Sequence, residues 1–253
     1  MMPPVRLSAT AFTHRGAVRE GNEDCIAVGD RVVSEPMTAP LRLERQIAAP
    51  LVCLVADGMG GHAAGEVASR VAAERLVEHA PRALDAAVLT ALLRAVNGEL
   101  FELMRAQPGL AGMGTTVAGV VVSPEACLVF NVGDSRVYRI GAAGLVQLST
   151  DDTPGPKLAD GRTAAIRSNL ITQTLGGDYH DEIAPHVLRE PLDRPRRYLI
   201  CSDGVSDLLS REEIEALIGD DPAASVTALF EAAMARGGRD NISLILLDLR
   251  PEP

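Results

Sequence analysis

Aromatic side chains are scarce in this sequence of 253 residues: they make up 3 % of it, and tryptophan is absent. Hydrophobic residues still make up 47 %, so a sizeable core can form, built mainly from Val, Leu, Ile and Ala. No apolar run approaches the ~20 residues of a membrane-spanning helix. The first residues also lack the basic start and apolar stretch of a secretory signal. We therefore expect a cytoplasmic protein without a membrane partner.

Cysteine clusters and net positive charge are lacking as well. The four cysteines are far apart and form no CxxC pair, which argues against a zinc site and a disulfide framework. They are Cys25, Cys53, Cys127 and Cys201. The formal net charge is −10, and a chain this acidic is not expected to bind nucleic acid or an anionic membrane.

Short apolar runs, many rich in β-branched residues, recur along the chain. Such runs near turn residues are typical of strands buried on at least one face. They are 51–56, 115–122, 127–132, 136–140, 197–202 and 242–249. The spacing from 115 to 148 predicts an antiparallel meander, with turns at 123–125 and 141–144. Two irregular stretches, 34–50 and 151–170, are predicted to be surface loops, and the length of the second makes it a candidate functional segment.

Four helical patterns lie between these runs. Apolar residues spaced by three or four predict long helices over 64–80 and 84–105. A shorter helix is expected after Ser210, which opens a capping-box pattern, and another after the Asp221-Pro222 pair. Strands grouped in runs favour antiparallel sheets with helices packed outside, which is an α+β fold, over alternating βαβ units.

Aspartates stand at the ends of four predicted strands. Asp57, Asp134 and Asp203 follow apolar runs and lie beside glycine, and Asp240 directly precedes the last run. One Asp-Gly pair after a strand is usually only a turn. Four carboxylates at strand ends, with glycines that allow close approach, would make an oxygen-rich pocket if they converge. Without a His or Cys cluster nearby, such a pocket favours Mg²⁺ or Mn²⁺.

Six segments, in this order, resemble the motifs of the metal-dependent protein serine/threonine phosphatases of the PP2C type, in their bacterial branch. They are RGAVREGNED (15–24), DGMGGHAAGEVAS (57–69), MGTT (113–116), NVGDSRVY (131–138), CSDGVSD (201–207) and GRDNIS (238–243). The resemblance implies a four-layer α-β-β-α sandwich, with two central antiparallel β-sheets flanked by pairs of helices and a binuclear metal site at one end. It also implies a single domain over 1–253, with a core at about 13–249 and a flap-like loop at about 150–175.

The resemblance assigns cation-binding roles to the aspartates. Asp57 would bridge two Mn²⁺ or Mg²⁺ ions, and the carbonyl of Gly58 would bind one of them. Asp203 and Asp240 would complete the shell of the second ion. A water held between such ions has a pKa lowered toward neutral and can attack phosphorus in line.

Outer roles follow from the same resemblance. Glu23 and Asp24 would act mostly through bound waters, and Asp134 would help to hold a third, weaker ion. Arg19 would grip the substrate phosphate with its guanidinium fork, although without this motif a plain surface arginine would be expected. His62 would be the general acid for the leaving oxygen, because histidine can titrate near pH 7. The other histidines, His14, His79, His180 and His186, are expected at the surface.

The chain departs from the family pattern after residue 148. Asp152 stands where a histidine is usual, and the stretch that follows is short, so substrate choice and the third cation stay open. We expect a monomer that hydrolyses phosphoserine and phosphothreonine in proteins and opposes a bacterial serine/threonine kinase. No tail follows Leu249-Arg250, so a membrane-anchored form is not expected.

Two alternatives keep the fold and change the function. One is a catalytically weak or inactive binding or regulatory module, which would require loss of a metal aspartate, whereas Asp57, Asp203 and Asp240 are all present. The other is a phosphatase for a phosphoprotein outside a kinase cascade, or for a small phosphomonoester, because loops read the leaving group. A nucleotide-binding enzyme is disfavoured, since the phosphate-cradling GxGxxG and GxxxxGK[ST] loops are absent.

Overall fold

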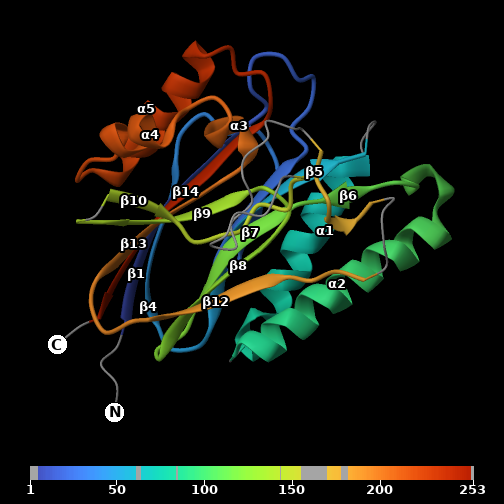
Figure 1. Ribbon diagram of the computed structural model, residues 1–253, viewed down its shortest axis with the longest axis horizontal. Helices are drawn as coiled ribbons and strands as arrows, with labels where there is room; N and C mark the ends of the chain where they lie inside the picture. The colour runs from blue at the N-terminus through green and yellow to red at the C-terminus, as the bar shows by residue number, and fades with distance from the viewer. Residues whose placement is uncertain are drawn as a thin grey trace.

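The computed structural model describes residues 5–60, 64–83, 85–142, 144–154, 170–177 and 182–251. Within these ranges the strands form two antiparallel sheets, of six and eight strands, which pack face to face with helices on both outer sides (Figure 1). This is the expected four-layer α-β-β-α sandwich. Among the described helices, none is both long enough and apolar enough to cross a membrane.

The first sheet has the strand order β10-β9-β13-β14-β1-β4. Its strands are β1 (Val5–His14), β4 (Leu41–Ile47), β9 (Arg136–Gly141), β10 (Gly144–Gln147), β13 (Arg196–Cys201) and β14 (Ile242–Pro251). The two long central strands pair over their whole length, from Val5 opposite Pro251 to His14 opposite Ile242. The sheet therefore begins before residue 13 and continues past 249, so the core is wider than predicted.

The second sheet has the order β11-β6-β5-β7-β8-β12, with β2 and β3 attached beside β5. Its strands are β2 (Asp24–Val28), β3 (Arg31–Val33), β5 (Leu51–Met59), β6 (Gly114–Thr115), β7 (Val117–Val122), β8 (Ala126–Val132), β11 (Leu175–Gly176) and β12 (His186–Pro191). Strand β5 has the most neighbours in this sheet: it pairs with β7 over residues 51–55, with β2 over residues 53–57 and with β6 at Gly58 and Met59.

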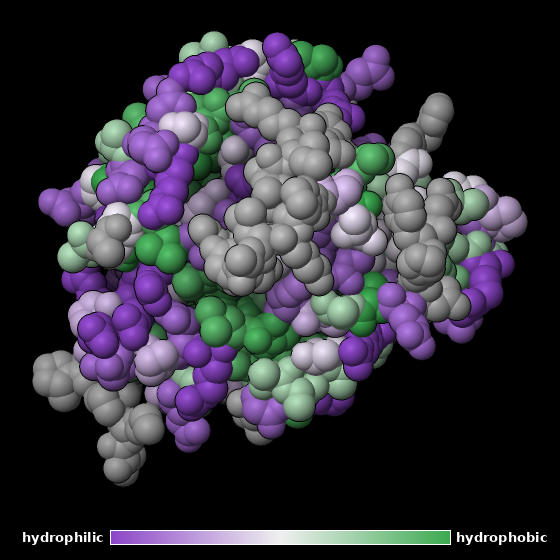
Figure 2. Space-filling view, in the orientation of Figure 1, coloured by the Kyte–Doolittle hydropathy of each residue, from purple (hydrophilic) through white to green (hydrophobic). Residues whose placement is uncertain are grey.

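Aliphatic side chains fill three layers. Alternation along β14 shows the pattern: Ile245 and Leu247 point between the sheets, while Leu244 and Leu246 point toward the C-terminal helices. Of the few aromatic residues, Tyr198 packs between the two sheets and Phe130 packs against the first helix pair. Figure 2 shows hydrophilic residues over most of one face, with hydrophobic ones gathered over the region of β8 and β12.

Helices cover both outer faces (Figure 1). They are α1 (Ala64–His79), α2 (Ala86–Ala106), α3 (Asp203–Ser206), α4 (Arg211–Leu217) and α5 (Pro222–Ala235), with 3-10 turns η1 (Ala80–Arg82) and η2 (Pro108–Leu110). The α1–α2 pair packs on the second sheet, and α3, α4 and α5 pack on the first. The capping box at Ser210 and the Asp221 cap are both present, as predicted from their sequence.

Two sequence predictions were wrong. The stretch 34–50 is not all loop, because β4 forms within it and pairs with β1. In its sequence LRLERQI, Leu43 and Ile47 are buried and the charged residues are exposed, as in an edge strand. The charged residues made this segment resemble a loop in the sequence. The 115–148 meander is also broken: β8 belongs to the second sheet and β9 to the first. The chain crosses between them at Gly133, where a positive φ of 99° favours glycine.

Candidate metal and phosphate site

Neighbouring strands bring the first two candidate carboxylates together. Asp24 opens β2 directly opposite Asp57 on β5. The peptide carbonyl of Asp57 accepts hydrogen bonds from the Thr116 amide (2.9 Å) and the Thr115 hydroxyl (3.0 Å), so its backbone is fixed. Asp24 is fully buried, whereas Asp57 keeps part of its surface exposed. The carboxylates of Asp24 and Asp57 thus belong to directly opposite residues of two neighbouring strands, at one end of the second sheet.

The first sheet delivers Asp203 and Asp240 to the same end. Asp203 begins α3 two residues after β13, and Asp240 lies two residues before β14, the neighbouring strand. Ser202 and Ser243 tie these two strand ends together, because the Ser202 amide donates to the Ser243 carbonyl (3.0 Å) and the Ser243 amide donates to the Ser202 hydroxyl (3.1 Å). The predicted convergence of strand ends is therefore found.

The electrostatics of this cluster are those of crowded, buried carboxylates. Burial, reinforced by the negative charge of Asp203, raises the pKa of Asp24 to about 7. Burial and the charge of Asp134 raise the pKa of Asp203 to about 7 as well. The pKa of Asp57 is raised well above its ordinary value by burial and by Asp24. Each carboxylate thus disfavours ionisation of the others, which a divalent cation would reverse.

Orphaned oxygens show that these residues fit cations. Both carboxylate oxygens of Asp24, and one each of Asp134 and Asp203, are buried and have no hydrogen-bond partner among the described residues. Such groups are costly in a protein interior unless something else binds them, and hard cations prefer carboxylate oxygens. Within the described ranges no three acidic, histidine or cysteine side chains already surround one point as ligands, so side-chain rotation would have to close the shell.

Gly58 lies where a side chain could not. A Cβ atom there would fall 2.5 Å from the carbonyl oxygen of Glu23 and would also meet the backbone of Gly65 at the start of α1. The amide of Gly58 donates to that same Glu23 carbonyl (3.2 Å). Close packing of these three backbones holds the 23–24 segment against the Asp57-Gly58 corner, as the glycine pattern predicted.

Arg19 reaches the site from the turn after β1. Its Nη2 lies 2.7 Å from Oδ2 of Asp240, and both side chains are part exposed, at 52 % and 35 %. This hydrogen bond raises the pKa of Arg19. The guanidinium therefore stands at the rim of the carboxylate cluster, where a phosphate group would arrive.

Asn241 is a site residue that sequence reasoning missed. Its Oδ1 accepts the Glu23 amide (2.8 Å), and its Nδ2 donates to the carbonyls of Arg15 (3.1 Å) and Gly21 (3.0 Å). Buried and fully bonded, it fastens the turn that carries Arg19 to the start of β14. The residues DN within GRDNIS were the only signal, because nothing in the sequence shows which carbonyls lie nearby.

The remaining candidates have mixed outcomes. Asp134 lies at the crossover after β8, and burial and the charge of Asp151 raise its pKa to about 6. Asp207, which had no predicted role, adds negative charge near Asp134 and Asp203. Glu23 is partly buried, with a pKa raised by burial. His62 lies outside the described residues.

Two histidines predicted to be plain surface residues are partly buried and make specific contacts. His14 is partly buried against Phe230, with ring centroids 5.1 Å apart, and accepts the Gly16 amide at Nδ1. His186 pairs with Asp152, at 2.9 Å. His79 is partly exposed, and His180 lies outside the described residues.

Comparisons with known proteins agree with this geometry. A family model described as Protein phosphatase 2C matches residues 42–246. The sequence is 34 % identical over 254 residues to the serine/threonine protein phosphatase PstP of Mycobacterium tuberculosis, which covers 96 % of this chain but 45 % of that protein. The chain thus spans about half the length of this curated relative. It is 30 % identical over 256 residues to the serine/threonine phosphatase stp of Listeria monocytogenes, with 93 % of each covered.

A solved structure extends the similarity to three dimensions. The crystal structure of the catalytic domain of PstP, in complex with two manganese ions, superposes with a TM-score of 0.78 at 33 % sequence identity. The match covers 97 % of this chain and 99 % of that one.

Proposed function

The chain belongs to the protein phosphatase 2C family, and from this premise we propose that it hydrolyses phosphoserine and phosphothreonine in proteins with two Mn²⁺ or Mg²⁺ ions. One observation carries the proposal: within the described part of the chain, buried carboxylate oxygens of Asp24 and Asp203 have no hydrogen-bond partner, and they lie at the end of the sandwich where Arg19 stands. Metal-assisted hydrolysis of a phosphate ester uses cations and a phosphate-binding fork side by side. The names and the manganese ions of the similar proteins support the same reading.

The residues divide the work by position. Asp57, Asp203 and Asp240 would hold the cations, together with the carbonyl of Gly58. When bound, such cations lower the pKa of water and neutralise charge on phosphoryl oxygens. Asp24 is buried, on the strand position opposite Asp57, and would orient bound water through its carboxylate oxygens.

The substrate-facing roles fall to three further residues. Arg19 would bind two equatorial phosphate oxygens through its planar fork, which Lys cannot imitate. His62 would give a proton to the leaving serine or threonine oxygen. Asp134, one residue beyond the crossover, would hold a third and weaker cation.

The inactive binding module has no support among the described residues, because Asp57, Asp203 and Asp240 are present and lie at one end of the sandwich. We keep a phosphoprotein outside a kinase cascade as the alternative substrate. We further propose that the protein acts as a cytoplasmic monomer opposite a serine/threonine kinase, which is the usual setting for such a phosphatase.

The test uses two substrates and one chelator. Purified protein with Mn²⁺ should hydrolyse p-nitrophenyl phosphate and a phosphothreonine peptide, and EDTA should abolish both activities until Mn²⁺ is returned. Asp57→Ala and Asp203→Ala should lose at least 10³-fold in kcat on both substrates, on the scale of a lost electrostatic contact to the transition state. Asp193→Ala, in the exposed turn between β12 and β13, is the matched control. Full activity in either site variant would overturn the proposal.

A further inference from the structure

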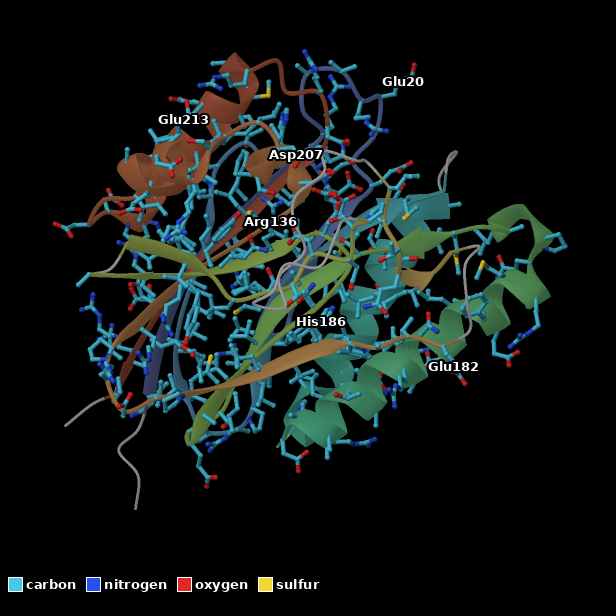
Figure 3. The ribbon with its side chains drawn as sticks, viewed as in Figure 1. Glu20, Arg136, Glu182, His186, Asp207 and Glu213 are labelled. Carbon is cyan, nitrogen blue, oxygen red and sulfur yellow. The ribbon has the colours of Figure 1, made fainter. Side chains whose placement is uncertain are left out.

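A second polar cluster surrounds Asp152, the residue that stands where the family usually has histidine. Its Oδ2 accepts hydrogen bonds from the Gly133 amide (2.8 Å) and from Nε2 of Gln173 (2.7 Å). Its Oδ1 lies 2.9 Å from Nε2 of His186, at the start of β12 (Figure 3). The Asp152 side chain is 11 % exposed. Three donors therefore converge on one nearly buried carboxylate.

The backbone repeats the same connections. The Asp152 amide donates to the Gly133 carbonyl (3.0 Å), and the Thr172 amide donates to the Asp152 carbonyl (2.7 Å). Asn131, near the end of β8, holds Thr150, two residues before Asp152, because its side chain bonds both the amide and the carbonyl of Thr150. The segment before residue 155 and the segment after residue 169 are thus fastened to the end of β8 at one point.

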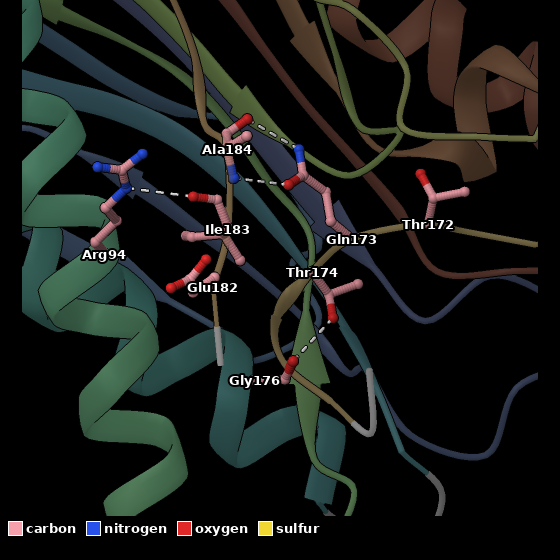
Figure 4. Close-up of a pocket in the computed structure, with 8 residues that line it drawn as sticks. All are labelled: Arg94, Thr172, Gln173, Thr174, Gly176, Glu182, Ile183 and Ala184. Atoms are coloured by element: carbon pink, nitrogen blue, oxygen red, sulfur yellow. Dashed lines mark hydrogen bonds between the residues drawn. The ribbon is translucent and has the colours of Figure 1, made fainter. Parts of the chain in front are cut away.

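Gln173 extends the cluster to a third segment. Its Oε1 accepts the Ala184 amide (2.9 Å), and its Nε2 donates to the Ala184 carbonyl (3.1 Å), as Figure 4 shows. Gln173 and Ala184 line a pocket. Arg94 of α2 also lines it and donates a hydrogen bond to the Ile183 carbonyl (3.2 Å). Gln173, in the wall of this pocket, and the Gly133 amide therefore both donate to the Asp152 carboxylate.

The position of Gly133 gives the cluster its consequence. Gly133 has a positive φ of 99° and directly precedes Asp134. One buried carboxylate oxygen of Asp134 has no hydrogen-bond partner among the residues that the structure describes. Both hydrogen-bonding groups of Gly133 are bonded to Asp152, so the peptide before Asp134 cannot rotate freely. The direction of the Asp134 side chain follows from that peptide.

We propose that Asp152, held by His186 and Gln173, is a positioning residue that aims the Asp134 carboxylate at its cation. The inference builds on the proposed function and deepens one part of it, the weaker cation site. An amide at 152 would lose the charge-assisted hydrogen bonds of the acid. It would keep the Gly133 and Gln173 contacts only if its NH₂ group faced His186 and that ring nitrogen accepted, in the other tautomer. Outer residues of this kind commonly change metal affinity by about 10–100-fold.

The experiment measures Mn²⁺ binding alone, by calorimetric titration of the whole chain, with Asp134→Asn marking the step that belongs to Asp134. In Asp152→Asn that step should weaken about 10-fold, while the tighter steps change less than about twofold. In the Asp134→Asn background, Asp152→Asn should have no further effect on Mn²⁺ binding. His186→Ala, which removes one donor, should shift the same step by a smaller factor.

Glu190→Gln is the matched control, because Glu190 is a buried acid on the same strand, paired with Arg139 at 2.8 Å, and has no contact with Gly133 among those described. It should leave every Mn²⁺ step unchanged. Equal weakening of all steps in Asp152→Asn, no weakening at all, or no binding step that depends on Asp134 would each overturn the inference. If Asp152→Asn does not fold, His186→Ala decides alone. The titration needs no substrate. An absence of phosphatase activity would therefore contradict the proposed function without deciding the outcome of the Mn²⁺ titration.

Discussion

Arg19 Nη2 lies 2.7 Å from Oδ2 of Asp240, although the two residues are 221 positions apart. One was predicted to grip phosphate and the other to bind a cation, and here they bind each other. Their part exposure, 52 % and 35 %, limits the pair to about 1 kcal/mol or less. Phosphate can therefore displace the carboxylate from the fork, and a cation can displace the fork from the carboxylate, at small cost.

Replacement of Arg19 tests both halves of this relationship. Arg19→Ala should lower kcat/KM on a phosphothreonine peptide by about 100-fold, and Arg19→Lys should recover only part of it, because an ammonium cannot form the fork. Without the Arg19 guanidinium, which competes with Mn²⁺ for the Asp240 carboxylate, Mn²⁺ should also bind more tightly. The gain should be no more than about fivefold, because the exposed Arg19–Asp240 pair is weak. Steady-state kinetics and Mn²⁺ titration measure the two effects.

Arg15→Ala is the control, since Arg15 is an exposed arginine of the same turn that makes no contact with Asp240 among those described. A loss as large in Arg15→Ala would show that the turn needs positive charge in general. Weaker Mn²⁺ binding in Arg19→Ala would contradict the competition.

The carboxylate cluster should make the metal-free protein sensitive to pH. Asp24 and Asp203 have pKa values of about 7 in the folded chain, above the ~3.9 of an unfolded chain. Between these values the folded state binds more protons, so the free energy of unfolding falls as pH rises from about 4 to 7 and levels off above. In EDTA, Tm should be lower at pH 8 than at pH 5.5. Stabilisation by saturating Mn²⁺ should be larger at pH 8.

Asp57→Asn separates this effect from other titrating groups. It removes one charge from the cluster, so in EDTA at pH 8 it should raise stability by about 2 kcal/mol, or roughly 4–8 °C in Tm. At pH 5.5 the gain should shrink, because the carboxylates are then largely protonated. Activity should be lost at every pH. A variant less stable than wild type at pH 8 would show that Asp57 is held by bonds rather than strained by its neighbours.

Local patterns in the sequence were enough for the main helices, for strands such as β5 and β14, and for the placement of Asp57, Asp203 and Asp240 at strand ends. They did not predict β1, which pairs along the whole of β14. Ser210 and Asp221 cap their helices as their side chains dictate, and β5 and β14 are apolar enough to identify directly. Strand β4 could not be predicted, because an edge strand needs only one apolar face and its charges resemble a loop. The crossing at Gly133 depends on which sheet each strand joins, and that is decided by packing across the whole chain.

Asn241 should matter to catalysis only through the turn that it holds. Asn241→Ala removes three hydrogen bonds, two of which fix carbonyls of residues 15 and 21, and should cost on the order of 2–3 kcal/mol of stability. Because Arg19 would lose its fixed position, KM for the phosphopeptide should rise about 10-fold with a smaller change in kcat. In an Arg19→Ala background the same substitution should leave KM almost unchanged. Additive effects of the two changes would show that Asn241 acts on the site by another route.

His62 can be tested through the leaving group, which depends on chemistry alone. The threonine alkoxide is a poor leaving group that needs a proton as the P–O bond breaks, whereas p-nitrophenolate leaves readily without one. His62→Ala should therefore lose about 10²–10³-fold in kcat on a phosphothreonine peptide and less than 10-fold on p-nitrophenyl phosphate. His79→Ala, at the last residue of α1, should match wild type on both substrates. Equal losses on the two substrates would mean that His62 supports the site in some other way, and the proton would then have to come from water.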